Sequence, residues 1–136
     1  MKHLLDKFGA HGFTILAFPS NQFGAQATGD SACEAAYMYH KMNTTSGAFP
    51  IFDKTDVNGP AESEAFTFLK YGGNWASQPG WIPSSNDEND ISWNYGKWLI
   101  GPSGIPVGRW TSGTDPLSFE ADIARLLASS SSTASY

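Results

Sequence analysis

Residues 13–24 read FTILAFPSNQFG, and this stretch decides the fold class. Its first half, Phe13 to Phe18, is a short and nearly continuous apolar run, which is typical of a strand buried on both faces in a parallel sheet. Pro19 cannot donate a backbone hydrogen bond, so the strand is predicted to end there. A polar loop from Ser20 to Gly29 follows at the carboxyl end of the strand, where open α/β sheets keep their binding sites.

The segment before this strand predicts a missing neighbour. Leu4, Leu5 and Phe8 recur at helical spacing, so residues 2–10 are expected to form a helix. Parallel strands are joined by crossover helices, and a strand should therefore precede this helix. None does, so we expect an α/β domain that lacks its first strand.

The rest of the chain alternates helical and extended patterns. Asp30 or Ser31 is suited to cap one helix, and Pro116 stands at a tolerated first-turn position of another. We expect one domain over residues 1–128 and a Ser-rich, disordered tail over residues 129–136. The further expected elements are helices over 30–42, 61–70 and 115–127, an extended segment over 49–52, a long loop over 72–92, and a hairpin with strands over 97–100 and 105–110.

Composition excludes several classes of function. The 136 residues carry a net charge of −5 with 8 Lys and Arg, so no nucleic-acid partner is expected. No apolar run has the length of a membrane span, and residues 1–12 do not resemble a signal peptide. Cys33 is the single cysteine, and the three scattered histidines show no metal-site spacing. We expect a cytoplasmic protein by default, although a missing N-terminus would take any targeting segment with it.

Five segments in order resemble signatures of the glutathione peroxidase family. Together they span most of the chain, from the loop after the first apolar run to the last helix. The resemblance implies a thioredoxin-like α/β fold, a three-layer sandwich in which the first, central strand is missing in this chain. The segments are FPSNQFG at 18–24, similar to FPCNQFG; FPIFDKTDVNG at 49–59, similar to FPIFDKVDVNG; SWNYGKWL at 92–99, similar to WNF-K-FL; and LIGPSGIPVGRW at 99–110 with PLSFEADIARLL at 116–127, similar to the family's closing hairpin and helix.

The resemblance also implies an activity. Family members are oxidoreductases that reduce hydrogen peroxide or organic hydroperoxides with a thiol, glutathione being the expected co-substrate of this chain, in the response to oxidative stress; no other cofactor is expected. Their tetrad of Cys or selenocysteine, Gln, Trp and Asn is matched by Gln22, Trp93 and Asn94. The nucleophile is expected upstream of Met1, so the chain alone is predicted to be inactive. Oligomeric state is left open.

Elementary chemistry fits these three residues. Peroxide reduction needs a thiolate or selenolate that is formed at neutral pH, and its surroundings must favour the anion. The amides of Gln22 and Asn94 and the indole of Trp93 are neutral N–H donors that can solvate such an anion.

Several positions depart from the family pattern. Ser20 replaces the Cys of FPCNQFG, and Ala27 with Thr28 replaces the Glu-Pro of QEPG. Family members that use thioredoxin carry a resolving Cys near the position of Tyr39. Its absence favours the glutathione-dependent type.

Two further residues have competing interpretations. Arg109 is a candidate for binding a glutathione carboxylate, although a solvated surface Arg is the favoured interpretation. Cys33, in the first turn of a predicted helix, is a rival nucleophile and thiol sensor, but the adjacent Glu34 opposes its ionisation and an inert thiol is favoured. The alternative to an enzyme is a catalytically inactive thioredoxin-fold binding or regulatory module.

Overall fold

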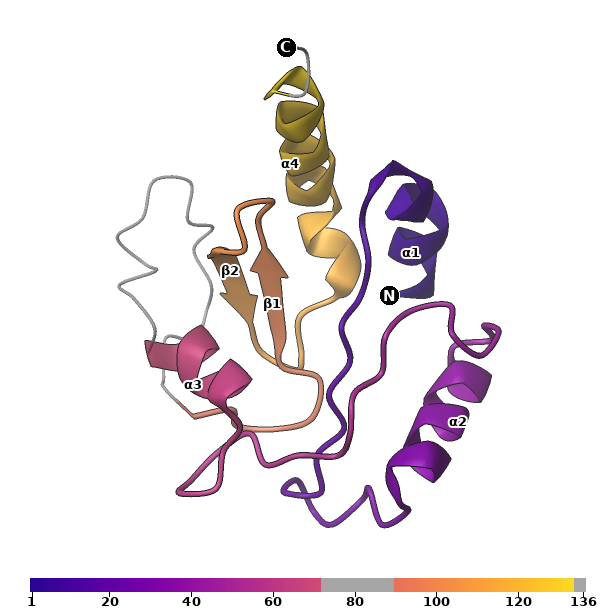
Figure 1. Cartoon of the computed structure of the whole chain (residues 1–136), viewed down its shortest axis with the longest axis vertical. Helices are drawn as coiled ribbons and strands as arrows, with labels where there is room; N and C mark the ends of the chain where they lie inside the picture. The colour runs from indigo at the N-terminus through magenta and orange to yellow at the C-terminus, as the bar shows by residue number, and fades with distance from the viewer. Residues whose placement is uncertain (72–89, 134–136) are drawn as a thin grey trace.

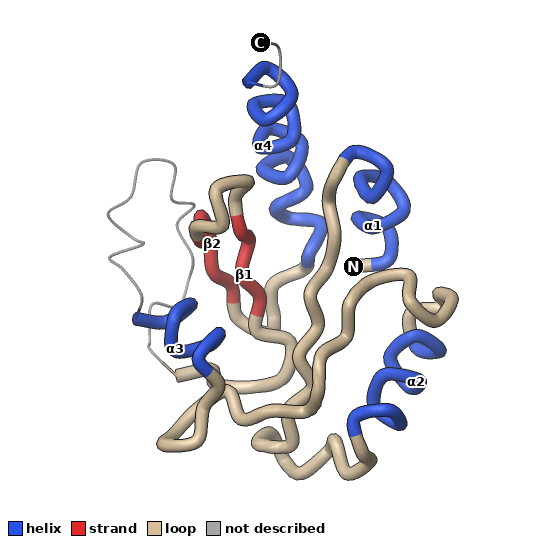
Figure 2. The backbone as a smooth tube through the Cα atoms, viewed as in Figure 1, coloured by secondary structure: helices blue, strands red, loops and turns tan. Residues whose placement is uncertain are grey.

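The computed structural model describes residues 1–71 and 90–133, and within α4 it places side chains as far as Ser129. Within these ranges, four α-helices, two short 3₁₀-helices and a β-hairpin form the regular structure (Figures 1 and 2). The predicted loop over 72–92 lies outside the described residues up to position 89. The elements are α1 (Lys2–Phe8), η1 (Gly9–His11), α2 (Ser31–Lys41), α3 (Glu64–Tyr71), β1 (Lys97–Ile100), β2 (Pro106–Trp110), η3 (Pro116–Phe119) and α4 (Glu120–Thr133).

The hairpin is the element that the sequence predicted most closely. Strands β1 and β2 pair antiparallel from Lys97 opposite Trp110 to Ile100 opposite Pro106, with an irregular register after Leu99. Gly104 closes the turn at φ 82°, in the left-handed region that favours glycine. Trp98 and Leu99 face opposite sides of the hairpin because side chains alternate along a strand. The hairpin therefore contributes to both halves of the core.

Two hydrophobic clusters lie on these two sides. The first joins α1, the hairpin and α4, and the second joins the loop after residue 18 to α3 and to the chain entering β1. Leu99 packs in the first cluster and Trp98 against the second. The buried members are Leu4, Phe8, Leu99, Trp110, Phe119 and Ile123 in the first cluster, and Phe23, Val57, Phe66 and Ile91 in the second.

The strand predicted over residues 13–18 differs from expectation. In the described part of the chain it makes one parallel bridge, between Ala17 and Ile51, and the rest is extended loop (Figure 2). Ile15 is buried, but the neighbouring Leu16 is 53% exposed, so the segment is not covered on both faces. A strand forms a continuous ladder and buries both faces only where neighbouring strands and covering helices are present. The observed pairing agrees with an α/β fold that lacks a strand beside this segment.

Helix ends follow local signals in two cases and depart from prediction in two. Asp30 caps α2 by accepting a hydrogen bond from the Cys33 N–H at 2.8 Å, as predicted. Helix α3 begins at Glu64 rather than near residue 61, because Glu62 forms a bridge with Asp56. Helix α4 continues to Thr133, into the predicted disordered tail over 129–136, since serine tolerates a helical backbone once a helix is established. Asp115 caps η3.

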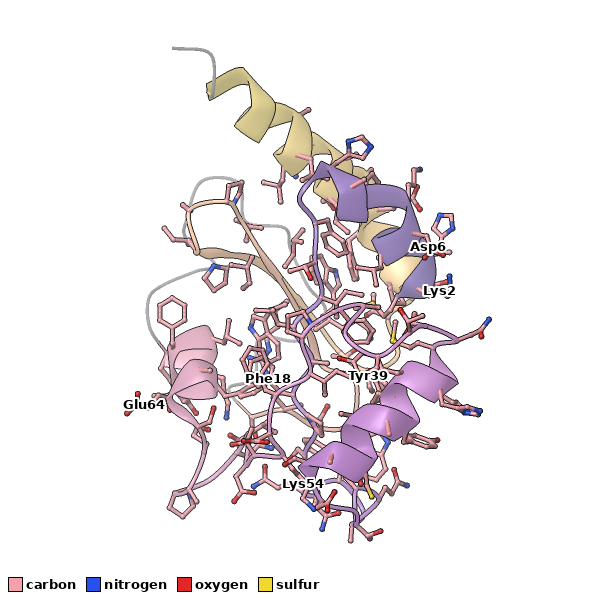
Figure 3. All side chains as sticks on the ribbon, turned by 45° about the vertical axis from the view of Figure 1, so that its right-hand side comes forward. Lys2, Asp6, Phe18, Tyr39, Lys54 and Glu64 are labelled. Atoms are coloured by element: carbon pink, nitrogen blue, oxygen red, sulfur yellow. The ribbon has the colours of Figure 1, made fainter. Side chains whose placement is uncertain are left out.

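Tyr39 is one of the residues that attach helix α2 to the body. Tyr39 points from the helix towards the interior (Figure 3), its hydroxyl donates to the Phe49 carbonyl at 2.8 Å, and the two rings lie 5.3 Å apart. Phe18, labelled near the middle of Figure 3, stacks on Phe52 at 4.4 Å and meets Phe66 edge-on at 5.4 Å. These contacts place the loop that follows Phe18 beside α3.

Candidate functional site

Gln22 is fixed by the backbone of a distant segment. Its Oε1 accepts hydrogen bonds from the N–H groups of Val57 at 2.8 Å and Asn58 at 3.0 Å, and its Nε2 donates to the Asn58 carbonyl at 2.8 Å. A carboxamide nitrogen carries two hydrogens, so one N–H remains for another acceptor. Gln22 is exposed, which leaves that hydrogen accessible. The side chain is therefore held in one orientation by three hydrogen bonds and keeps one donor.

Trp93 lies against the same loop. Its indole is 6.2 Å from the Phe23 ring, centroid to centroid, and is 49% exposed. Gly24 has a φ of 67°, and a Cβ at this position would lie 3.4 Å from the Trp93 indole. Glycine suits this position for two reasons: it adopts the left-handed backbone without strain, and it has no side chain between the backbone and the ring. The indole is held beside the Gln22 loop while part of it remains open to solvent.

Asn94 contacts this loop through its side chain. Its Nδ2 donates to Oε1 of Gln26 at 2.9 Å. The next residue, Tyr95, has a φ of 64°, which is uncommon for an aromatic residue and turns the chain into β1. A strained backbone persists only where surrounding contacts hold it, and such positions cluster at functional sites. The structure therefore brings Trp93 and Asn94 against the loop that carries Gln22.

Asn58 and Lys70 complete the support of this region, and sequence reasoning did not single them out. The Asn58 side chain accepts from the Ile91 N–H at 2.9 Å and donates to the Ile91 carbonyl at 2.8 Å. The Lys70 ammonium is fully buried and contacts Asn58 Oδ1 at 3.0 Å, Glu62 at 2.5 Å and Asp90 at 3.3 Å. Its hydrogen bond holds the pKa of the Glu62 carboxyl below its ordinary value. The DVNG sequence at 56–59 is typical of a turn and does not indicate this side-chain role.

Arg109, for which a solvated surface position was favoured from sequence, makes specific contacts. It is half-buried, its Nη2 donates to the Asp90 carbonyl at 3.1 Å, and its guanidinium lies 4.9 Å from the centre of the Trp98 ring. These contacts place it beside the second cluster rather than free on the surface.

Cys33 is exposed at the start of α2. The negative charge of Asp30 raises the pKa of its thiol, and the hydrogen bond to that carboxylate, desolvation and the charge of Glu34 act in the same direction. The thiolate, which is the reactive form, is therefore disfavoured despite the helix N-terminus. The inert interpretation of this thiol is consistent with these surroundings.

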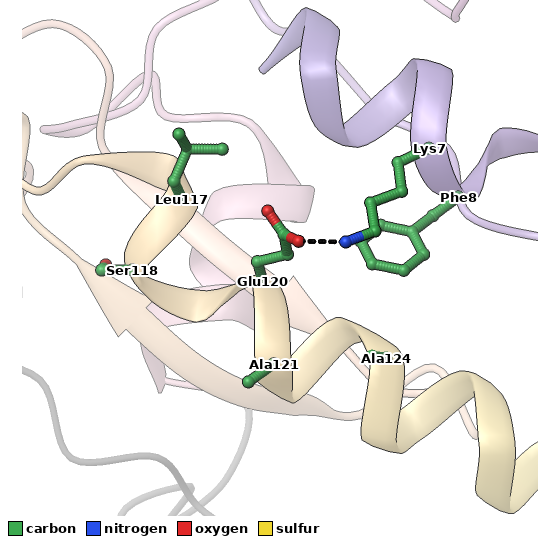
Figure 4. A pocket seen from close by; sticks show the side chains of 7 residues that line it. All are labelled: Lys7, Phe8, Leu117, Ser118, Glu120, Ala121 and Ala124. Atoms are coloured by element: carbon green, nitrogen blue, oxygen red, sulfur yellow. Dashed lines mark hydrogen bonds and ion pairs between the residues drawn. The ribbon is translucent and has the colours of Figure 1, made fainter.

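A surface groove lies away from these residues. A groove of about 440 Å³ runs between α1 and the η3–α4 junction, where Lys7 and Glu120 form an ion pair across it (Figure 4). Beside Trp93 the described atoms enclose a space of about 10 Å³. Of the three candidate donors, Gln22 and Trp93 are exposed and Asn94 is half-buried. Among the described residues, no group of three or more His, Cys, Asp and Glu side chains could hold a metal ion. No helix in the described ranges is long and apolar enough to cross a membrane.

Comparisons with known structures define the fold. A crystal structure titled T. cruzi GPX1 matches 93% of this chain and 68% of its own with a TM-score of 0.63 at 31% identity. The crystal structure of Trgpx in apo form matches 93% and 67% with a TM-score of 0.64 at 25% identity. The fold is therefore of the thioredoxin-like α/β class that glutathione peroxidases share.

Sequence comparisons define the family. The family model described as glutathione peroxidase matches residues 1–70. The hydroperoxy fatty acid reductase gpx1 of Synechocystis is 38% identical over 133 residues, covering 93% of this chain and 71% of the relative. The mitochondrial glutathione peroxidase 1 of Chlamydomonas reinhardtii is 39% identical over 91% of this chain and 55% of the relative. A chloroplastic phospholipid hydroperoxide glutathione peroxidase of Arabidopsis thaliana is 38% identical over 94% and 49%.

The chain belongs to the glutathione peroxidase family. This confirms the resemblance drawn from the five sequence segments and the α/β thioredoxin-like class. The chain spans about half to seven-tenths of the length of these curated relatives.

Proposed function

We propose that the protein acts as a thiol-dependent peroxidase, which reduces hydrogen peroxide or organic hydroperoxides and uses Gln22, Trp93 and Asn94 to stabilise an anionic nucleophile. The observation that supports this proposal is that all three residues belong to, or contact, the same loop. Gln22 is held by three hydrogen bonds, and Trp93 and Asn94 each contact the loop on which it stands.

The reaction balances with a thiolate or selenolate as nucleophile. The anion attacks one peroxide oxygen, a sulfur–oxygen or selenium–oxygen bond forms, and the oxygen–oxygen bond breaks. The leaving oxygen takes up a proton and departs as water or an alcohol. Two molecules of a thiol such as glutathione then reduce the oxidised nucleophile and leave as a disulfide with water. Neutral N–H donors lower the free energy of the anion without adding a charge that would have to be neutralised.

The nucleophile is assigned to a residue outside the 136 residues. Cys33 is the single cysteine of the chain, and the nearby carboxylates of Asp30 and Glu34 raise the pKa of its thiol. A nucleophile needs the opposite environment, one that lowers its pKa. Residues 1–136 therefore supply the donors of the site, and the chain by itself is proposed to be inactive.

Names of the relatives support the substrate class and bear on the compartment. Hydroperoxy fatty acid and phospholipid hydroperoxide appear in two of these names, which supports lipid hydroperoxides as substrates beside hydrogen peroxide. The words mitochondrial and chloroplastic also appear among these names. We propose glutathione as the reductant and retain the cytoplasm as the proposed compartment, to be tested by imaging the tagged native protein.

Three substitutions test the donor roles in the native protein isolated from its source organism or expressed from its complete gene. Gln22→Ala, Trp93→Phe and Asn94→Ala should each lower the rate of peroxide reduction, by about a hundredfold for a donor that contacts the anion. Ser92→Ala, an exposed neighbour, is the control. Peroxide consumption is followed with glutathione in excess. Rates equal to that of the control variant would remove these residues from the mechanism.

A catalytically inactive binding module remains the alternative, favoured by the raised pKa of the only thiol in the chain. A folded native protein that consumes no peroxide would decide for it.

A further inference from the structure

We propose that Asn58 is a positioning residue that holds Gln22 and the Trp93–Asn94 segment in one site, and that the buried Lys70 holds Asn58 in place. This inference rests on the proposed function in one respect, namely that these three residues are the donors of the site. The contacts that carry it are independent of any reaction.

Asn58 is bonded to both sides of the site. Its backbone N–H and C=O both bond the carboxamide of Gln22, which lies 36 residues earlier in the chain. Its own carboxamide pairs with the N–H and C=O of Ile91, 33 residues later. Ile91 stands two positions before Trp93. One residue thus links the segment that carries the first donor to the segment that carries the other two.

The chemistry of an asparagine is required at this position. Its Nδ2 donates to the Ile91 carbonyl, and its Oδ1 accepts from both the Ile91 N–H and the Lys70 ammonium. Two lone pairs on Oδ1 are then used. An aspartate would lose the donor to Ile91, and an alanine would lose all three hydrogen bonds and leave buried partners unsatisfied.

Lys70, which supports Asn58, is itself fixed by its neighbours. Its side chain is 0% exposed, and its three partners, Asn58, Glu62 and Asp90, match the three N–H donors of an ammonium group. Glu62 and Asp90 are the two carboxylates that compensate the buried charge. A buried cation that loses its partners is costly, so the ammonium and Asn58 fix each other's position.

Within the described residues, no helix or sheet joins the two segments that Asn58 links. The Gln22 loop and the 90–96 segment lie outside every helix and strand, and the described sheet consists of β1 and β2. The bonds of Asn58 therefore act together with the Asn94–Gln26 hydrogen bond and the Phe23–Trp93 contact to set the distance between the donors. Loss of Asn58 should loosen the packing between Phe23 and Ile91 in the second cluster and let the donors move apart, while the first cluster stays packed.

Hydrogen exchange in the isotopically labelled 136-residue chain tests this directly. In Asn58→Ala and Lys70→Met, the Ile91 amide should exchange about tenfold faster than in the parent chain. The first variant removes the oxygen that accepts the Ile91 N–H, and the second removes the ammonium that holds this oxygen in place. The amide of Ile123 in α4 should change much less. Lys70→Arg, which keeps the charge and the donors, should restore part of the protection. Lys97→Met, which removes a half-buried ammonium bonded to the carbonyls of Thr111 and Ser112, is the matched control.

The same spectra report on the donors themselves. The Trp93 indole N–H resonance should shift, and the nuclear Overhauser contact between Phe23 and Trp93 should weaken, in Asn58→Ala but not in Lys97→Met. Equal acceleration at Ile91 and Ile123, or no change at Ile91, would overturn the proposal, since a general loss of stability would then be the whole effect. Should Asn58→Ala fail to fold, the parent chain decides: a coupling across the hydrogen bond from Asn58 Nδ2 to the Ile91 carbonyl is expected, and its absence refutes the proposal.

These readouts require no peroxide and no nucleophile. A native protein without peroxidase activity would end the proposed function and leave the exchange results untouched. An active native protein in which Asn58→Ala leaves Ile91 exchange and the Trp93 resonance unchanged would end the positioning role alone.

Discussion

Gly108 in β2 is the position where one added methyl group should destabilise the fold most clearly. A Cβ at this residue would lie 2.9 Å from Cζ3 and 3.0 Å from Cζ2 of the Trp110 indole, and nearer still to Cη2. Carbon atoms in favourable contact are about 3.5–4.0 Å apart. The indole folds back over Gly108 because residues two apart on a strand share a face.

The Trp110 ring has little room to move away. It is 8% exposed and stacks on Phe119 with ring centroids 4.4 Å apart, inside the first cluster. Gly108→Ala should therefore lower the free energy of unfolding by about 1–3 kcal/mol, as overpacking of a core does. The corresponding fall in melting temperature is roughly 3–12 °C.

Urea and thermal denaturation followed by circular dichroism measure this effect. Gly113→Ala is the control, since no described atom lies within 4 Å of a Cβ built there and its φ is not in the left-handed region. Its unfolding free energy should change by less than about 0.5 kcal/mol. Equal unfolding free energies for the two variants would refute the packing argument around Trp110.

Two further expectations concern titratable groups. The hydrogen bond from Lys70 lowers the pKa of the Glu62 carboxyl from its ordinary value of 4.5. The pair therefore stabilises the folded state above pH 4.5, and this contribution is lost as the pH falls through the lower pKa of the folded state. Measured against pH in the acid range, the free energy of unfolding should show this loss in the parent chain and not in Glu62→Gln. The charge of Asp30 raises the pKa of the Cys33 thiol, so iodoacetamide at pH 8 should alkylate Cys33 more slowly than a free cysteine. The variant Asp30→Asn, whose side chain can still cap α2, should be alkylated faster than the parent chain. An unchanged alkylation rate in Asp30→Asn would mean that another group controls the thiol.

Local signals account for what the sequence predicted well. The cap at Asp30 and the hairpin turn over 101–104 depend on neighbouring residues, and both form as expected. The apolar run at 13–18 is a different case, because a strand needs partners that lie elsewhere in the chain. Within the described residues, this run pairs with another segment at a single bridge, between Ala17 and Ile51.

Side-chain contacts between distant segments could not be predicted in the same way. Gln22 was found through the family motif, but its bonds to the backbone of Asn58 have no sequence pattern of their own. Lys70 ends the helix predicted over 61–70, and no sequence pattern indicates that its ammonium is fully buried. Arg109, expected on a solvated surface, bonds the Asp90 carbonyl instead. Each depends on a fold that brings distant parts of the chain into contact, as Lys70 and Asp90 show at a separation of 20 positions.

The central claim is that this family member reduces peroxides at a site formed by Gln22, Trp93 and Asn94. The most direct measurement is peroxide consumption by the native protein, purified in folded form and assayed with glutathione in excess. We expect catalytic loss of peroxide, with two glutathione molecules oxidised for each peroxide reduced. A folded native protein that leaves hydrogen peroxide and lipid hydroperoxides unchanged over many equivalents would contradict it.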